Sequence, residues 1–138
     1  MEKDKVLITG ADGQLGQELA EVFSSWEVIS TNFHSLDITN KAKVKEIFEK
    51  EKPDWVIHCA AWTDVEGCAE NPEKAIKVNG EATKNLAEAA KIISAKLVYI
   101  STNEVFDGKK TSPYLEADQT NPINPYGVSK MVWEKFVQ

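Results

Sequence analysis

The chain has 138 residues, of which 42% are apolar and 28% are charged, and its formal net charge is −6 at pH 7. This length and composition are typical of one globular domain. The negative charge argues against nucleic acid and anionic membrane surfaces as partners. All 16 basic residues are lysines, so no guanidinium group is available to bind a phosphate with two parallel hydrogen bonds.

Strand and helix patterns alternate along the chain. In order, we expect a strand over 5–9, a helix over 13–24, a strand over 27–31, a helix over 40–51, a strand over 55–59, a helix over 71–94, a strand over 96–101 and a helix from Tyr126 onward. Asn40 and Asn71 are candidate helix caps, and Pro72 suits a first helical position. The first helix is expected to turn one apolar face inward, made of Leu15, Leu19, Val22 and Phe23.

This alternation predicts an α/β fold, in which a parallel sheet carries helices on both faces. We expect residues 1–138 to form a single domain, and the family resemblance described below implies a Rossmann-like dinucleotide-binding sheet with the strand order 3-2-1-4. In that order the fourth strand is an edge. An unpaired apolar edge favours association, so a homodimer or a completing chain is an expected partner.

Three glycines follow the first strand, in the segment TGADGQLG (9–16). In such folds a glycine-rich turn between strand and helix binds a pyrophosphate. One glycine permits the sharp turn, one lets the backbone approach the phosphates, and one lets the helix pack close to the strand. The alternative is a plain strand–helix turn. The spacing differs from that of a phosphate loop, and no lysine follows it.

A second candidate site lies in the segment PYGVSK (125–130). Tyr126 and Lys130 are four residues apart at a helix start, so they share one face. An ammonium beside a phenol favours the phenolate and suits the phenol to proton transfer to a carbonyl. Ser101 and Thr102, at the end of the fourth strand, could hydrogen-bond the same substrate oxygen. A solvated Tyr–Lys pair is the alternative.

Neither the cysteines nor the histidines indicate a metal site. Cys59 and Cys68 lack metal-ligand spacing, and we expect reduced thiols in a cytoplasmic protein. His58, in a strand expected to be buried, is interpreted as a core residue. The apolar run near the N-terminus, Val6-Leu7-Ile8, has only three residues, so neither a signal peptide nor a membrane span is expected.

Several segments together resemble the extended short-chain dehydrogenases/reductases, and most closely the dTDP-4-dehydrorhamnose reductase family. They are VLITGADGQLG (6–16), LDIT (36–39), HCAAWTDVEGCAE (58–70), KVN (77–79), YISTNEVFDG (99–108), PYLEAD (113–118) and NPINPYGVSK (121–130). The resemblance implies NADPH or NADH as coenzyme, and hydride transfer to a 4-keto nucleotide sugar. It implies a catalytic trio in which Thr102 orients the carbonyl, Tyr126 donates the proton and Lys130 binds the nicotinamide ribose.

The resemblance also implies the residues that contact the coenzyme. Besides Tyr126 and Lys130, they are Gly10, Gly13, Gln14, Leu15, Gly16, Asn32, Asp37, Ile38, Ala60, Ala61, Trp62 and Asn79. At Asn32 the family usually has an acid that binds the adenosine ribose. Its absence removes repulsion toward a 2′-phosphate, so we expect NADPH to be accepted at least as well as NADH.

Two departures from the family bear on function. Asn103 and Glu104 replace an Asp-Tyr pair next to Thr102. The chain also stops before the last strands and the lobe that holds the nucleotide sugar in the family, so we expect a truncated form or a subunit that another chain completes. We do not expect turnover by the 138 residues alone. The alternative function is a non-catalytic dinucleotide-binding subunit that resembles the beta subunit of methionine adenosyltransferase.

Overall fold

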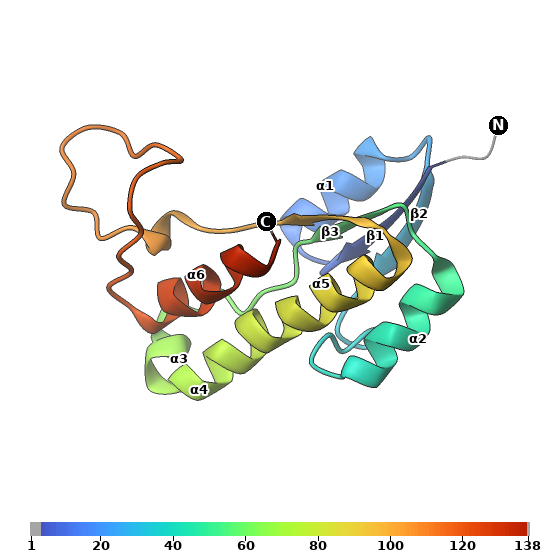
Figure 1. The fold of residues 1–138 in the computed structure, drawn as a ribbon, viewed down its shortest axis with the longest axis horizontal. Helices are drawn as coiled ribbons and strands as arrows, with labels where there is room; N and C mark the ends of the chain where they lie inside the picture. Colours follow the sequence, from blue (N-terminus) through green and yellow to red (C-terminus); the bar gives the residue numbers. More distant parts are fainter. Residues whose placement is uncertain (1–3, 138) are drawn as a thin grey trace.

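Four parallel strands form the centre of the fold, and helices cover both faces of the sheet (Figure 1). The structure is a computed structural model that describes residues 4–137. The strands are β1 (Lys5–Thr9), β2 (Glu27–Thr31), β3 (Trp55–His58) and β4 (Lys96–Tyr99). The helices are α1 (Gln14–Val22), α2 (Lys41–Glu51), α3 (Val65–Glu70), α4 (Pro72–Ala75), the π-helix η1 (Ile76–Glu81), α5 (Ala82–Ile93), the 3₁₀ turn η2 (Asn103–Val105) and α6 (Pro125–Val137).

The strands lie in the order β2-β1-β3-β4. The parallel α/β class is therefore confirmed, but the predicted order 3-2-1-4 is wrong. Helix α1 packs on the face of the sheet that carries Val6 and Ile8, whereas α2 and α5 pack on the opposite face, which carries Leu7. The connection from β1 to β2 passes over one face through α1, and the connection from β2 to β3 passes over the other face through α2. Because both crossovers are right-handed, they step across the sheet in opposite directions. Consequently β2 and β3 flank β1 on its two sides, and β3 does not pair with β2.

Helix α1 turns a different face to the sheet than the one predicted. Leu19 and Phe23 pack against β1, as expected, but Leu15 and Val22 are 43% and 71% exposed. Gly16 takes the buried position instead, because a Cβ there would lie 2.3 Å from the carbonyl oxygen of Gly10. The helix therefore contacts the turn after β1 through Gly16, and Leu15 points away from the core.

The predicted helix over 71–94 is one helical run with a wider π-helical segment inside it, which the sequence pattern did not indicate. This segment buries Asn79 and Gly80 against α6. A Cβ at Gly80 would lie 1.8 Å from Nε1 of Trp133, so only glycine permits this approach. Helix α3 was likewise not predicted. The cap at Asn40 is confirmed, because its side chain accepts a hydrogen bond from the backbone N–H of Lys43 at 3.1 Å.

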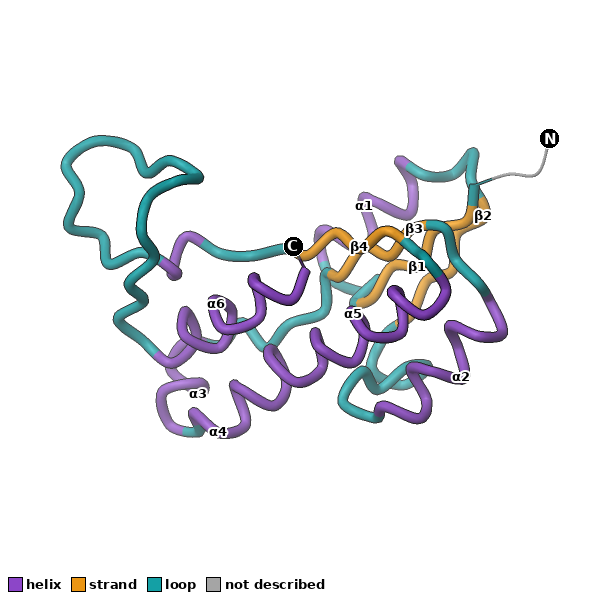
Figure 2. Tube along the Cα trace, viewed as in Figure 1, coloured by secondary structure: helices purple, strands orange, loops and turns teal. Residues whose placement is uncertain are grey.

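A long loop between η2 and α6 projects away from the sheet (Figure 2). Its own side chains brace it: the Asp107 carboxylate accepts hydrogen bonds from the Tyr114 hydroxyl at 2.9 Å and the Asn121 amide at 3.1 Å. The rings of Phe106 and Tyr114 stack with centroids 4.3 Å apart. Within residues 4–137, no helix is long and apolar enough to cross a membrane.

Strand β4 is an edge of the sheet, because among the described residues it pairs with β3 alone. Val98, in its middle, is 39% exposed. We expect chains to associate through this edge, since it offers unpaired backbone groups beside an apolar side chain. Light scattering should show dimers or larger species at high concentration, and Val98→Lys should lower their proportion. Val22→Lys, on the exposed side of α1, is the matched control. A monomer whose β4 amides are protected from hydrogen exchange would contradict this expectation.

Candidate functional site

A cleft of about 410 Å³ lies at the carboxyl ends of β1, β2 and β3. In parallel α/β sheets this is the end at which ligands bind. Eight of the predicted coenzyme residues line it: Gly10, Gly13, Asn32, Asp37, Ile38, Ala60, Ala61 and Trp62. Its other lining residues, which the sequence analysis did not select, are Thr9, Asp12, Phe33, Leu36, Thr39, Cys59, Lys74 and Val78. Thr9 and Cys59 could have been predicted as cleft residues from the sequence, because Thr9 ends β1, Cys59 directly follows β3, and ligands bind at the carboxyl ends of parallel strands.

The glycine turn forms one wall of the cleft. Gly10 has a φ of +65°, and a Cβ there would lie 2.8 Å from the backbone of Ala60, so the turn requires glycine. Gly13 precedes α1 with an ordinary φ of −79°, and a Cβ there would meet only the Gly10 oxygen, at 3.3 Å. The first backbone N–H groups of a helix lack intrahelical partners. Bare backbone at Gly13 therefore leaves them accessible to an anion in the cleft.

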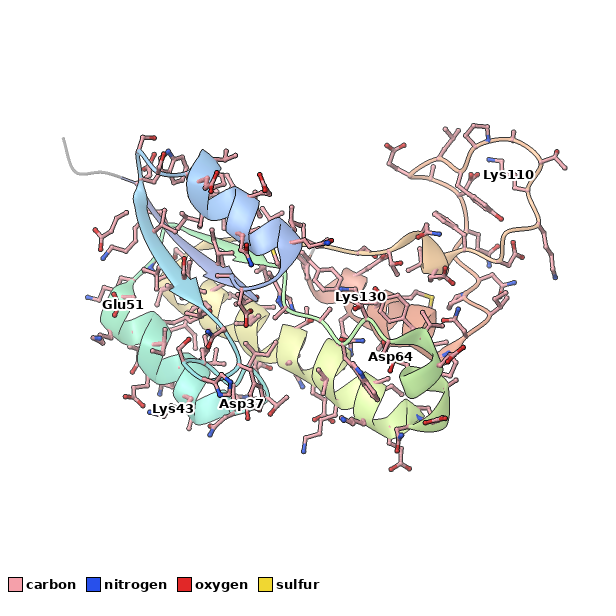
Figure 3. All side chains as sticks on the ribbon, turned by 180° about the vertical axis from the view of Figure 1, so that it is seen from behind. Asp37, Lys43, Glu51, Asp64, Lys110 and Lys130 are labelled. Carbon is pink, nitrogen blue, oxygen red and sulfur yellow. The ribbon has the colours of Figure 1, made fainter. Side chains whose placement is uncertain are left out.

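The loop after β2 forms the second wall. Asn32 Oδ1 accepts hydrogen bonds from the backbone N–H groups of His34 at 3.0 Å and Ser35 at 3.1 Å, so its side chain shapes the loop. Asp37 Oδ1 accepts from the hydroxyl of Thr39 at 2.7 Å. In Figure 3, Asp37 lies just beyond the end of β2. Phe33, which is 73% exposed, completes this wall with an apolar ring.

The third wall is the segment Ala60–Trp62, and Asn79 holds its end. Asn79 lines no part of the cleft and is 1% exposed. Its Oδ1 accepts from the backbone N–H of Trp62 at 2.7 Å, and its Nδ2 donates to the Trp62 carbonyl at 3.0 Å. On the cleft side, Lys74 Nζ lies 4.4 Å from the centroid of the Trp62 indole, a cation–π contact. Lys74 is the one cation among the described residues that line this cleft.

The predicted catalytic residues lie outside this cleft. Tyr126 is 9% exposed and packs against Cys68, Ala75 and Trp62, behind the third wall. Thr102 lines a separate hollow of about 520 Å³ next to η2. Its Oγ1 accepts from the backbone N–H of Glu104 at 3.2 Å, and an oxygen that accepts keeps its own hydrogen to donate. The structure therefore brings eight of the fourteen predicted coenzyme residues together in one cleft, but it places the predicted catalytic trio outside that cleft.

The loop that carries Thr102 is tied to the start of α6. The Glu104 carboxylate accepts from the Asn124 amide at 2.7 Å, and Asn124 Oδ1 accepts from the backbone N–H of Gly127 at 2.8 Å. A Cβ at Gly127 would lie 2.1 Å from the carbonyl oxygen of Glu104. Glu104, which replaces a tyrosine of the family's Asp-Tyr pair, therefore helps to fix the start of the helix that carries Tyr126.

Lys130 joins α6 to the end of β4 (Figure 3). Its ammonium donates to the Ile100 carbonyl at 2.6 Å and lies 4.3 Å from the centroid of the Tyr99 ring, and the residue is 3% exposed. Burial lowers the pKa of Lys130 to about 8, although the charges of Glu134 and Cys59 act in the opposite direction. Burial also raises the pKa of the Cys59 thiol, which the Lys130 charge partly offsets.

The other predicted contacts lie at the edge of the cleft or away from it. Gln14 and Leu15 are exposed in the first turn of α1, and Gly16 is buried beneath it. These three residues shape the turn without lining the cleft.

Comparison with known proteins gives one consistent family. Residues 4–138 match the family described as RmlD substrate binding domain. The chain is 41% identical to the dTDP-4-dehydrorhamnose reductase of Burkholderia thailandensis, over 96% of this chain and 45% of that protein. It is 37% identical to the methionine adenosyltransferase 2 subunit beta of Xenopus tropicalis, over 96% and 42%. The chain thus spans about half the length of these relatives.

A solved structure agrees with this comparison. The dTDP-4-dehydrorhamnose reductase of Bacillus anthracis, in complex with NADP, superposes with a TM-score of 0.94 at 39% identity, over 99% of this chain and 49% of that one.

The burial of Lys130 predicts a pH dependence of stability. Between pH 8 and 10.5 the unfolded chain still binds the lysine proton while the folded chain has released it, so stability gains from rising pH. Relative to Lys130→Met, the free energy of unfolding of the wild type should rise by about 2 kcal/mol from pH 8 to pH 10. Denaturant titrations of both proteins at each pH measure this difference. A difference that stays constant would contradict it.

Proposed function

The chain belongs to the RmlD substrate binding domain family, and we propose that it is the coenzyme-binding part of a reductase that uses NADPH to reduce a 4-keto nucleotide sugar. The observation that carries this proposal is the cleft at the carboxyl ends of the strands, in which Gly10 and Gly13 leave the backbone bare. The similarity to a reductase solved with NADP supports it. Residues 1–138 then form one NAD(P)-binding domain.

The walls of the cleft fit the parts of such a coenzyme. The bare backbone from Gly10 to Gly13 and the start of α1 suit the pyrophosphate. Asp37 and Ile38 would flank the adenine, on the wall of the cleft that also carries Phe33 and Asn32. Ala60 to Trp62 would run along the rest of the coenzyme toward α6.

The proposed catalytic roles belong to residues of α6 and of the segment that follows β4. NADPH, when bound, would be the source of the hydride for the carbonyl carbon of the sugar. Tyr126 would give its phenolic proton to the carbonyl oxygen, and the Thr102 hydroxyl would donate a hydrogen bond to that oxygen. Lys130 would bind the nicotinamide ribose with the ammonium that now contacts the Ile100 carbonyl. Both Thr102 and Ile100 follow β4, so these roles belong to one end of the sheet.

A second candidate is a non-catalytic dinucleotide-binding subunit. The similarity to the methionine adenosyltransferase 2 subunit beta, over the same 96% of the chain, favours it. Both candidates bind the dinucleotide, but only the first oxidises it. Because residues 1–138 alone are not expected to catalyse the reaction, the test adds a dTDP-4-keto-6-deoxy sugar to the NADPH-saturated homodimer, or to the NADPH-saturated protein together with a completing chain, and follows the NADPH absorbance. A falling absorbance identifies the reductase, whereas saturable NADPH binding with an unchanged absorbance identifies the non-catalytic subunit.

The proposal predicts coenzyme binding by the chain itself. NADPH should raise the melting temperature in a saturable manner, because a ligand of the native state stabilises it by RT ln(1 + [L]/Kd), about 2.7 kcal/mol at a hundredfold excess over Kd. Gly13→Val should abolish this shift, since the added side chain enters the cleft from a position with an ordinary φ. Gly108→Asn, in the distant loop at a φ of +72° with no atom near its Cβ, is the control. No shift at millimolar NADPH would refute the proposal.

Coenzyme preference can be tested by a change of charge at one position. Asn32→Asp keeps the oxygen that accepts from His34 and Ser35, so the loop should retain its shape. The new carboxylate would repel a 2′-phosphate and could accept from a free 2′-hydroxyl. We expect the Kd for NADPH to rise about tenfold or more, a cost of about 1.4 kcal/mol, while the Kd for NADH stays equal or falls. Titrations of both coenzymes measure this. An equal change for the two would place the ribose elsewhere.

A further inference from the structure

His58, the last residue of β3, lies in the core with both ring nitrogens hydrogen-bonded. It is 1% exposed. Its Nδ1 lies 2.8 Å from the hydroxyl oxygen of Thr9 in β1, and its Nε2 lies 3.0 Å from the hydroxyl oxygen of Thr83 in α5. The expectation of a buried core histidine is therefore confirmed, but the ring also links three elements through polar contacts that apolar packing does not require.

Counting hydrogens assigns a direction to these contacts. The Thr83 hydroxyl, which also contacts the Tyr99 side chain, donates its one hydrogen to the Asn79 carbonyl at 2.8 Å, so it accepts from His58 Nε2–H. Nδ1 then carries no hydrogen and accepts from the Thr9 hydroxyl. The Thr9 oxygen in turn accepts from the backbone N–H of Ala60 at 3.2 Å. The opposite tautomer would make Thr83 donate to Nε2 and would leave the Asn79 carbonyl without this bond.

The charge state of the ring agrees with this assignment. Burial, and secondarily the positive charge of Lys130, lower the pKa of His58 to about 3. The imidazole is therefore neutral throughout the physiological range, and a neutral ring has one donor and one acceptor. In this series of hydrogen bonds every donated hydrogen then points the same way, from Ala60 through Thr9, His58 and Thr83 to the Asn79 carbonyl. Hydrogen bonds aligned in this way polarise and strengthen one another.

Both ends of this series of hydrogen bonds reach the same wall of the cleft. Ala60 is its first donor. At the other end, Asn79 lies in the π-helix and clamps both backbone groups of Trp62. Asn79 Nδ2 also donates to the Ser129 hydroxyl at 3.0 Å, which donates to the Tyr126 carbonyl at 2.7 Å. The same network thus connects the wall Ala60–Trp62 to the first turn of α6.

We propose that His58 is a positioning residue: as the Nε2–H tautomer, it fixes the cleft wall of residues 60–62 relative to β1 and to the helix that carries Tyr126 and Lys130. The consequence for coenzyme affinity rests on the function proposed above, whereas the positioning of the wall does not. Ser129 and Thr83, neither of which was predicted as a site residue, belong to the same network.

The first test is the tautomer in the wild-type chain without coenzyme. The chain has two histidines, and His34 is exposed, so His34→Gln assigns their signals in a long-range ¹⁵N–¹H spectrum. We expect a protonated Nε2 and an unprotonated Nδ1 for His58, with no titration down to pH 5. A His58 ring that is protonated at Nδ1, or that gains a second proton above pH 5, would overturn the proposal.

The second test interrupts the series of hydrogen bonds at Thr83. Thr83→Val removes the acceptor of Nε2–H with little change in shape, and Thr83→Ser restores it. Thr31→Val removes another buried hydroxyl, which donates to the Ile8 carbonyl at 3.0 Å outside the network, and serves as the stability control. We expect Thr83→Val to speed hydrogen exchange of the Trp62 amide about tenfold or more and to weaken NADPH binding about fivefold. Thr83→Ser and Thr31→Val should stay within about twofold of the wild type.

The readouts separate the two proposals. If the wild type does not bind NADPH, the proposed function fails, while exchange at Trp62 still decides the positioning role. Unchanged exchange at Trp62 in folded Thr83→Val would overturn that role. If Thr83→Val does not fold, the tautomer of the wild-type ring decides it.

Discussion

The close approach of α1 to the end of β1 is the constraint on which the rest of the structure depends. Gly16 lies so near the Gly10 carbonyl that any side chain would collide with it, and Gly10 itself adopts a conformation that disfavours other residues. This approach sets the rotation of α1, and with it which apolar residues reach the sheet. It also brings the turn within contact of Ala60 at the end of β3. The glycines thus determine the position of the cleft as well as the tightness of one turn.

A second set of close approaches fixes α6. Gly80 admits Trp133, Gly127 admits the Glu104 carbonyl, and Lys130 bonds to Ile100. Burying a lysine in an apolar environment costs free energy, as its lowered pKa shows. The hydrogen bond to the Ile100 carbonyl and the contact with the Tyr99 ring offset part of this cost. A buried lysine with a depressed pKa is typical of functional positions, which agrees with the role proposed for it.

Much of the fold could be predicted from the sequence, because strands of β-branched residues and capped helices carry local signals. The bounds of β1 and β2 and the cap at Asn40 were predicted, as were eight of the residues that line the cleft. What failed depends on contacts distant in sequence. The strand order depends on which face each helix covers, and the rotation of α1 on the bare backbone at Gly16. The π-helix and the bonds of His58 arise only when β1, β3 and α5 are packed together, and no local pattern encodes them.

The position of the lining residues along the chain suggests how binding and chemistry are divided. Every described residue that lines the cleft lies between Thr9 and Val78, whereas Thr102, Tyr126 and Lys130 follow β4. The two parts meet through Asn79, Ser129 and the packing of Tyr126 behind Trp62. With the roles proposed above, changes after β4 would alter the chemistry while the cleft persists. The similarity to a reductase and to a methionine adenosyltransferase subunit covers the same 96% of this chain, so the two candidate functions differ in the residues that fill this span and not in its extent.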